Sequence, residues 1–110
     1  MHITKKYLIL LIFIITSLTL EASVFKGQRE YMKKCKVCHG NGAKVAKAKT
    51  SEEWIRLFEN GGSLIIKAHE KDQEAMKYFG SERFKNRSKH LLDFLKKYAA
   101  DSGNVPACSD

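Results

Sequence analysis

Residues 31–42 read YMKKCKVCHGNG, so Cys35 and Cys38 are separated by two residues and His39 follows directly. Three soft donors at this spacing can belong to a redox-active disulfide, to a zinc site, or to the attachment point of a covalently bound prosthetic group. A structural zinc site needs four ligands, usually from two clustered pairs. The remaining candidates, Cys108, His69 and His90, are not paired at ligand spacing. The motif therefore does not predict a complete zinc site.

A redox dithiol usually lies where a strand ends and a helix begins, and no segment of this chain shows the alternating pattern of such a strand. Covalent haem uses every residue of the motif. Two cysteines one helical turn apart can each form a thioether to a vinyl group, and the following histidine can bind the iron. We therefore predict one haem c, held through Cys35 and Cys38, with His39 as the proximal iron ligand.

Apolar residues recur at helical spacing along most of the chain, which predicts an all-α fold. Val24, Gly27, Tyr31 and Cys35 share one face of a first helix, and residues 40–50 are expected to form a loop. Further helices are expected over 50–62, ending at Asn60-Gly61-Gly62, over 63–80, and over 88–103. Their expected inward residues are Trp54, Leu57, Phe58, Ile65, Ile66, Ala75, Met76, Phe79, Leu91, Phe94, Leu95 and Tyr98.

The amino-terminal stretch is typical of an export signal. Lys5 and Lys6 precede an apolar run of 14 residues from Tyr7 to Leu20, which is short for a bilayer span of about 20 residues. We therefore expect residues 1–22 to be a cleaved signal peptide. Residues 23–110 then form the domain, with an irregular tail from about 102, in the periplasm. Contact with a membrane is expected only if the signal is not cleaved.

Loss of residues 1–22 removes two lysines and one glutamate, which leaves 18 Lys+Arg against 11 Asp+Glu and a net charge of +7. Export argues against nucleic acid as the partner of this charge, so an acidic protein surface is the expected partner. The mature chain has about 88 residues, and a core of this size often needs a disulfide, a metal or a cofactor. A monomer is expected.

Residues 27–42 resemble the amino-terminal helix of the small, single-haem class I cytochromes c. That helix carries a glycine, an aromatic residue four positions later, and CxxCH after four more, as Gly27, Tyr31 and Cys35 do here. Residues 91–99 resemble the family's last helix, with Tyr98 as the aromatic residue that packs over Gly27. The resemblance covers most of residues 25–100 and implies a small helical domain wrapped around one covalently bound haem.

The chain departs from the family at the distal ligand, because no Met-Pro pair exists. We rank Met76 first, since it lies 37 residues after His39, close to the family's methionine. His90, at the start of the last apolar face, ranks second. His69 ranks third, because its neighbours are charged and exposure is expected for it. An open sixth position is the remaining alternative.

The resemblance implies a periplasmic carrier of single electrons between redox partners rather than an enzyme. The alternative is a haem protein with an open or weakly held sixth position that senses a small ligand or acts as a minor peroxidase. A thiol-disulfide or metal-binding module without haem is the third possibility. Trp54, Arg56 and Arg83 are candidates for contact with the haem propionates, or else are core and surface residues. The sequence assigns no role to Cys108.

Overall fold

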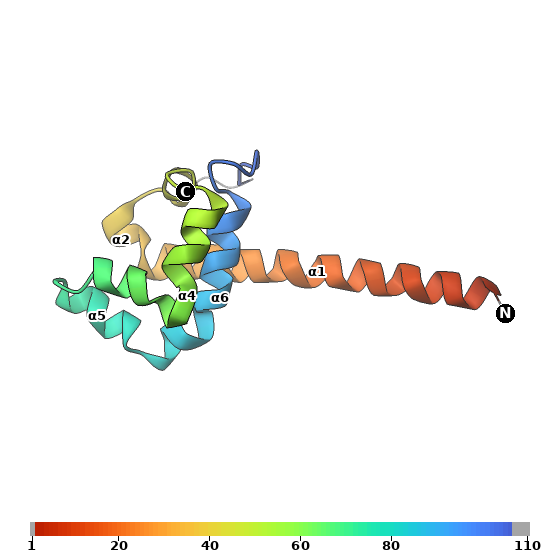
Figure 1. Ribbon diagram of the computed structural model, residues 1–110, viewed down its shortest axis with the longest axis horizontal. Helices are drawn as coiled ribbons and strands as arrows, with labels where there is room; N and C mark the ends of the chain where they lie inside the picture. The colour runs from red at the N-terminus through yellow and green to blue at the C-terminus, as the bar shows by residue number, and fades with distance from the viewer. Residues whose placement is uncertain (1, 107–110) are drawn as a thin grey trace.

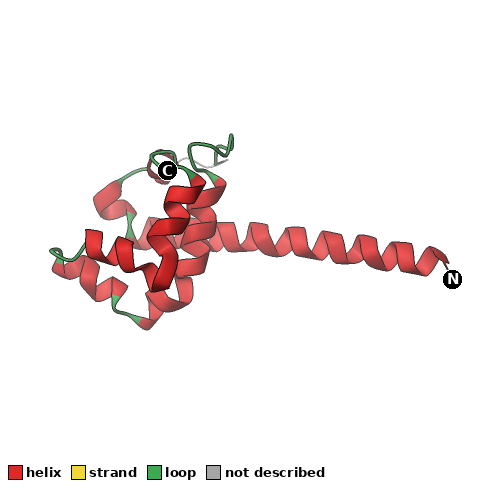
Figure 2. Cartoon of the chain, viewed as in Figure 1, coloured by secondary structure: helices red, strands yellow, loops and turns green. Residues whose placement is uncertain are grey.

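The computed structural model describes residues 2–106, and every regular element in this range is a helix, as Figure 2 shows. The prediction of an all-α fold is confirmed. The helices, in chain order, are α1 His2–Lys34, α2 Lys36–His39, α3 Gly42–Ala46, α4 Ser51–Ala68, α5 Gln73–Phe79 and α6 Glu82–Lys97.

Helix α1 is continuous over 33 residues, and its amino-terminal part projects away from the other helices (Figure 1). The large apolar side chains between Ile3 and Leu20 are exposed, whereas burial begins at Ser23 and Val24. Among the described residues, one helix, Ile3–Lys34, is long and apolar enough to cross a membrane. A cleaved signal sequence and an anchor both satisfy that test, so the predicted boundary at residues 22 and 23 stays a prediction.

The core forms where α1 crosses α6. Gly27 lies at the crossing, because a Cβ atom at this position would lie 1.8 Å from the carbonyl oxygen of His90 and 2.9 Å from Cβ of Phe94. A glycine thus lets the two backbones approach each other. The atoms nearest to this position belong to His90 and Phe94. Tyr98, the aromatic residue expected to pack over Gly27, packs edge-on against Phe94 with ring centres 5.6 Å apart, and its packing over Gly27 stays a prediction. The buried core cluster comprises Tyr31, Ala46, Trp54, Phe84, Leu91, Phe94, Leu95 and Ala99.

The loop expected over residues 40–50 contains a short helix, α3, so that expectation is wrong in part. The side chain of Asn41 accepts a hydrogen bond from the backbone N–H of Lys44 and caps the amino terminus of α3. Asparagine is among the residues that cap helices best. Ala46 is fully buried at the end of this turn, which explains why the segment packs against the core and folds.

Helix α4 begins with a capping box, in which Thr50 and Glu53 each bond the other's backbone N–H. Residues 59–62 leave helical geometry, and φ is positive at Asn60, Gly61 and Gly62, so α4 consists of two parts joined by a kink. The predicted stop at these residues is confirmed. The expected helix over 63–80 is wrong as a single element, because it breaks after Ala68 and α5 starts after Asp72, whose carboxylate caps Ala75.

Helix α6 starts earlier than expected, at Glu82, because Ser81 caps it by accepting from the N–H of Phe84. It ends at Lys97, several residues before Gly103. Leu91, Phe94 and Leu95 are buried as predicted, and the other residues expected to face inward, apart from the buried Trp54, are half-buried. The tail from about 102 is irregular as far as residue 106; Cys108 lies outside the described residues.

Candidate functional site

The CxxCH motif lies at the junction of α1 and α2. Hydrogen bonds run from the N–H of Cys35 to the carbonyl of Tyr31, at 2.8 Å, and from the N–H of His39 to the carbonyl of Cys35, at 2.9 Å. The helical path therefore continues through the motif with only a brief irregularity at Cys35. Cys35 is half-buried and packs against the core, whereas Cys38 and His39 are exposed.

Tyr31 fixes the turn that follows the motif. Its hydroxyl donates a 2.7 Å hydrogen bond to the carbonyl of Gly40, while its ring packs against Phe94 with centres 5.7 Å apart. Gly40 has a φ of 76°, which a side chain disfavours. A Cβ at Gly42 would lie 3.1 Å from the rings of both Tyr31 and Phe94, so a side chain there would crowd the packing. The motif is thus held against α6 through one buried tyrosine and two glycines.

The two thiols of the motif are free, with no disulfide between them. Burial, together with the nearby charges of Glu30 and Cys38, raises the pKa of the Cys35 thiol to about 12. A catalytic or redox-active cysteine needs a lowered pKa, because the thiolate is the reactive form. The surroundings of Cys35 therefore disfavour the dithiol interpretation.

The side chain of His39, the last residue of the motif, faces that of His69. Their Nε2 atoms are 3.4 Å apart and their ring centres are 5.7 Å apart. His69 lies at the carboxyl end of α4, and its Nδ1 is 2.7 Å from the carbonyl oxygen of Ile65. The expectation that His69 is exposed is wrong: the residue is half-buried, with its ring 4.8 Å from that of Phe79.

His90 lies on the other side of the α1–α6 crossing. Its Nδ1 is 2.7 Å from Oγ of Ser23, whose hydroxyl donates to Oδ2 of Asp93 at 2.6 Å. Burial, together with the positive charges of Lys26 and Arg87, lowers the pKa of His90. The Ser23 hydroxyl lies between His90 and Asp93, so these hydrogen bonds connect α1 to α6. In a catalytic triad the histidine would lie between the serine and the aspartate.

Met76 is half-buried in α5, and its carbonyl accepts a hydrogen bond from the N–H of Gly80 at the end of that helix. The structure therefore brings His69 to His39, and it places His90 beside Ser23. This differs from the ranking made on sequence, in which Met76 came first and His69 last.

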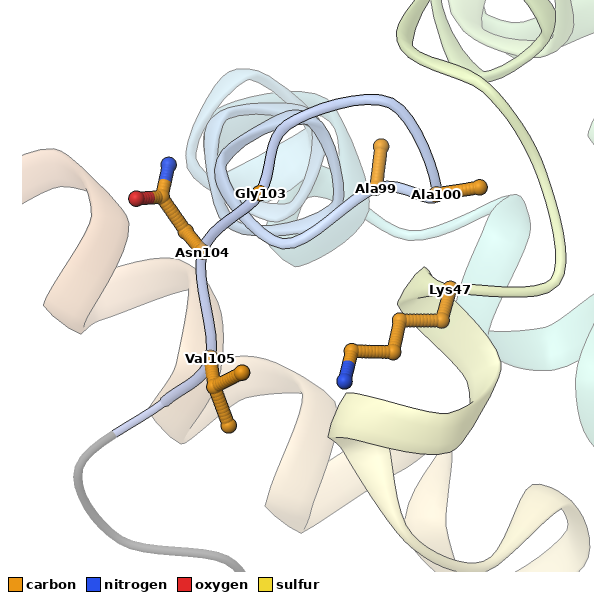
Figure 3. Close-up of a pocket in the computed structure, with 6 residues that line it drawn as sticks. All are labelled: Lys47, Ala99, Ala100, Gly103, Asn104 and Val105. Carbon is orange, nitrogen blue, oxygen red and sulfur yellow. The ribbon is translucent and has the colours of Figure 1, made fainter.

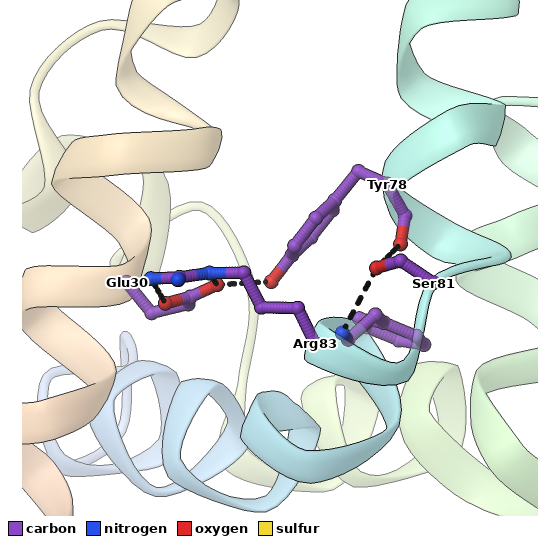
Figure 4. Close-up of polar contacts among 5 residues, drawn as sticks. Glu30, Tyr78, Ser81 and Arg83 are labelled. Atoms are coloured by element: carbon purple, nitrogen blue, oxygen red, sulfur yellow. Dashed lines mark hydrogen bonds and ion pairs between the residues drawn. The ribbon is translucent and has the colours of Figure 1, made fainter.

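A buried carboxylate that the sequence analysis did not single out lies one turn before Cys35. Glu30 is 2% exposed and receives hydrogen bonds from Arg83, at 2.9 and 2.8 Å, and from the hydroxyl of Tyr78, at 2.8 Å (Figure 4). Burial alone would raise the pKa of Glu30, but these hydrogen bonds outweigh it and lower the pKa. Burial and the bond to Glu30 also raise the pKa of Tyr78. The sequence signal that could have identified Glu30 is an isolated acidic residue on the face of the first helix that is expected to be buried.

The three side chains considered for propionate contacts are engaged elsewhere. The indole N–H of Trp54 donates to the carbonyl of Ala46 at 2.9 Å, within the core. Arg83 pairs with Glu30, and Arg56 pairs with Glu52 on the surface. The interpretation of Trp54 as a core residue is thus confirmed, and both arginines take part in ion pairs.

Among the residues that the structure describes, a pocket between α3 and the end of α6 is lined by six residues that include no cysteine and no histidine (Figure 3). Its lining residues are Lys47, Ala99, Ala100, Gly103, Asn104 and Val105. Within residues 2–106, no cluster of three or more His, Cys, Asp or Glu side chains could hold a metal ion by itself. The described chain thus offers no zinc site. No family model, no curated protein and no solved structure matches this chain.

The residue types and sequence spacing of the motif are those that a c-type haem would need. Two free thiols lie at the required spacing on a nearly helical path, and an exposed imidazole follows them. Cys35 packs against the buried core cluster, as do the half-buried apolar side chains of Leu57, Phe58, Ile65, Ile66 and Phe79. A covalently bound macrocycle needs such thiols, an iron ligand and an apolar wall.

Proposed function

We propose that this chain is a periplasmic, monohaem c-type cytochrome that carries single electrons between redox partners. The observation that carries the proposal is the arrangement of Cys35, Cys38 and His39: two free thiols and an imidazole on one helical path, fixed to the core by Tyr31. When bound, the haem supplies a one-electron iron couple. The protein's part is to hold the group, to set its axial ligands and to limit its exposure to water.

The chain's own residues divide these tasks. Cys35 and Cys38 provide the thioether bonds, and His39 provides the proximal nitrogen. On the core side, Cys35 packs against an apolar wall that includes the buried Phe94 and Leu95 of α6. Such a wall keeps water from one face of the group and reduces the reorganisation that a change of charge requires.

The surface around the motif is positively charged. Residues 31–51 contain six lysines and no aspartate or glutamate. Lys33, Lys34, Lys44, Lys47 and Lys49 are exposed in the structure. The edge of the domain that presents Cys38 and His39 therefore carries the charge that suits a brief encounter with an acidic redox partner.

Intact-mass analysis of the secreted chain, expressed with haem-ligation machinery, tests the proposal. The parent should carry the added mass of one haem and show its visible spectrum in both oxidation states. The variant Cys35→Ala with Cys38→Ala should lose the covalent group and most of its helical structure, since the small core lacks its cofactor. Cys108→Ser is the matched control and should keep the haem. A parent without added mass, or a double variant that retains it, would refute the proposal.

A further inference from the structure

The two imidazoles of His39 and His69 meet tip to tip. The difference between their centre-to-centre distance, 5.7 Å, and their Nε2–Nε2 distance, 3.4 Å, is 2.3 Å. A five-membered ring with bonds of about 1.33 Å has a radius of about 1.15 Å, so this difference is about two ring radii. Both Nε2 atoms therefore lie close to the line that joins the ring centres, and each nitrogen points at the other.

The tautomer of His69 is set by its other nitrogen. Nδ1 is 2.7 Å from the carbonyl oxygen of Ile65, which can only accept a hydrogen bond, so Nδ1 carries the hydrogen. In the neutral ring the lone pair is then on Nε2, the atom that faces His39. Metal-binding histidines commonly donate their second ring N–H to a backbone carbonyl in this way. The ring of Phe79, 4.8 Å away, packs against the imidazole.

The spacing suits one metal atom between the two rings. Metal–imidazole bonds of about 2.0–2.1 Å, as zinc forms, would place the two nitrogens about 4 Å apart when the metal lies between them. The observed 3.4 Å requires a widening of only about 0.6 Å, which falls within side-chain adjustments of the exposed His39. Two histidines do not form a metal site by themselves, so the pair needs a further ligand frame of the kind a porphyrin provides.

The other two candidates are less well placed. Ser23, which binds His90, precedes Cys35 by twelve residues on α1, or about 18 Å along the helix axis. His90 is therefore held about three helical turns away from the motif. Met76 is half-buried in α5, whereas the imidazole that faces His39 belongs to His69.

We propose that His69 is the distal axial ligand, so that the iron is bound by two imidazoles, from His39 and His69. This inference rests on the function proposed above, and it decides among the ligands that the sequence left open. A second histidine in place of methionine lowers the reduction potential. It also occupies the position that a small ligand would need, which places the chain among electron carriers and not among ligand sensors.

Visible spectra, carbon monoxide binding and potentiometric titration of the haem-loaded protein test the assignment. The parent should lack the far-red band of an iron–methionine bond. His69→Met should gain that band and shift to a higher potential. His69→Ala should bind carbon monoxide to the ferrous form more tightly. The factor by which the affinity for carbon monoxide rises equals the inverse of the fraction of parent molecules whose sixth iron position is open. It is about tenfold if that position is open in one parent molecule of ten.

Met76→Ala and His90→Ala are the matched controls, and both should leave the spectrum, the carbon monoxide affinity and the potential as in the parent. His69→Met guards against misfolding, because it retains a ligand at the same place. A far-red band in the parent that Met76→Ala abolishes would overturn the assignment while leaving the proposed function intact. A His69→Ala variant whose ferrous form binds carbon monoxide with the affinity of the parent would also overturn the assignment and leave the proposed function intact. A parent that carries no covalent haem overturns the proposed function, and this inference with it.

Discussion

Replacing Gly27 by alanine places a methyl group where α1 and α6 cross. The new Cβ would lie 1.8 Å from the carbonyl oxygen of His90, whereas ordinary van der Waals contact begins near 3.4 Å. The obstacle is backbone, so no side-chain rotation relieves it. The two helices must separate by about 1.6 Å, or one of them must shift along its axis.

This displacement affects the packing on both sides of the crossing. A radial gap of about 0.5–1 Å already forfeits a quarter to a half of the attraction between packed atoms. Val24, Tyr31, Leu91 and Phe94, all buried at this interface, lose contact together. The expected loss of free energy of unfolding is similar to that caused by truncating one large core side chain, about 2–5 kcal/mol. The higher helix propensity of alanine offsets about 1 kcal/mol of this loss. We therefore expect a net destabilisation of about 3 kcal/mol, out of a total of about 4–13 kcal/mol for a domain of this size.

Thermal unfolding of the parent and the variants, followed by far-ultraviolet circular dichroism, measures the effect. A loss of about 3 kcal/mol corresponds to a Tm lower by about 12–24 °C in a domain of this size. Gly80→Ala is the matched control, because Gly80 has helical backbone angles and its Cβ would meet only a carbonyl oxygen at 3.2 Å. It should change the stability by about 0.5 kcal/mol. Equal melting temperatures for the two variants would refute the close crossing.

Two further predictions concern charge. Because its pKa is lowered, the ionised Glu30 stabilises the fold above the ordinary carboxyl pKa, and this stability is lost as the pH falls through the lowered pKa of the folded protein. Glu30→Gln should therefore lower the free energy of unfolding by about 2 kcal/mol near neutral pH. In urea titrations at several pH values, the variant should lose less further stability on acidification than the parent does. Equal losses in the two proteins would contradict the role of Glu30. Electron transfer to an acidic redox protein should slow as salt rises, and Lys33→Gln with Lys34→Gln should reduce both the rate and its salt dependence in stopped-flow measurements. A rate that does not respond to salt would exclude these lysines as a docking surface.

The sequence predicted the elements whose physical signal is local. The helical spacing of Val24, Gly27, Tyr31 and Cys35 placed one face of α1 correctly, because a stripe of that width can be buried in only one orientation. The stop at residues 60–62 was also correct, since Asn and Gly tolerate positive φ better than most residues do. Both patterns are read within a few residues, and tertiary packing reinforces them.

His69 and Glu30 were misjudged because their partners are distant in sequence, whereas the break within residues 63–80 was missed although its helix cap is local. Residues 63–80 were read as one helix, but Asp72 caps a new one, and its role depends on where the preceding chain turns. Charged neighbours made His69 look exposed, yet Phe79 covers its ring and His39 faces it from thirty residues away. Glu30 escaped notice because its partners, Tyr78 and Arg83, follow it by 48 and 53 residues.

The kink in α4 links these observations to the site. A straight helix from Ser51 would carry residue 69 away from the domain along one axis, about 27 Å from its start. Positive φ at Asn60, Gly61 and Gly62 redirects the chain instead, and Gly62 packs closely, with 3.1 Å between its Cβ position and the ring of Phe84. The second part of α4 thereby places His69 opposite His39. The fold therefore brings the two histidines together through three residues in a conformation that most side chains disfavour, which makes the kink as much a part of the site as the motif itself.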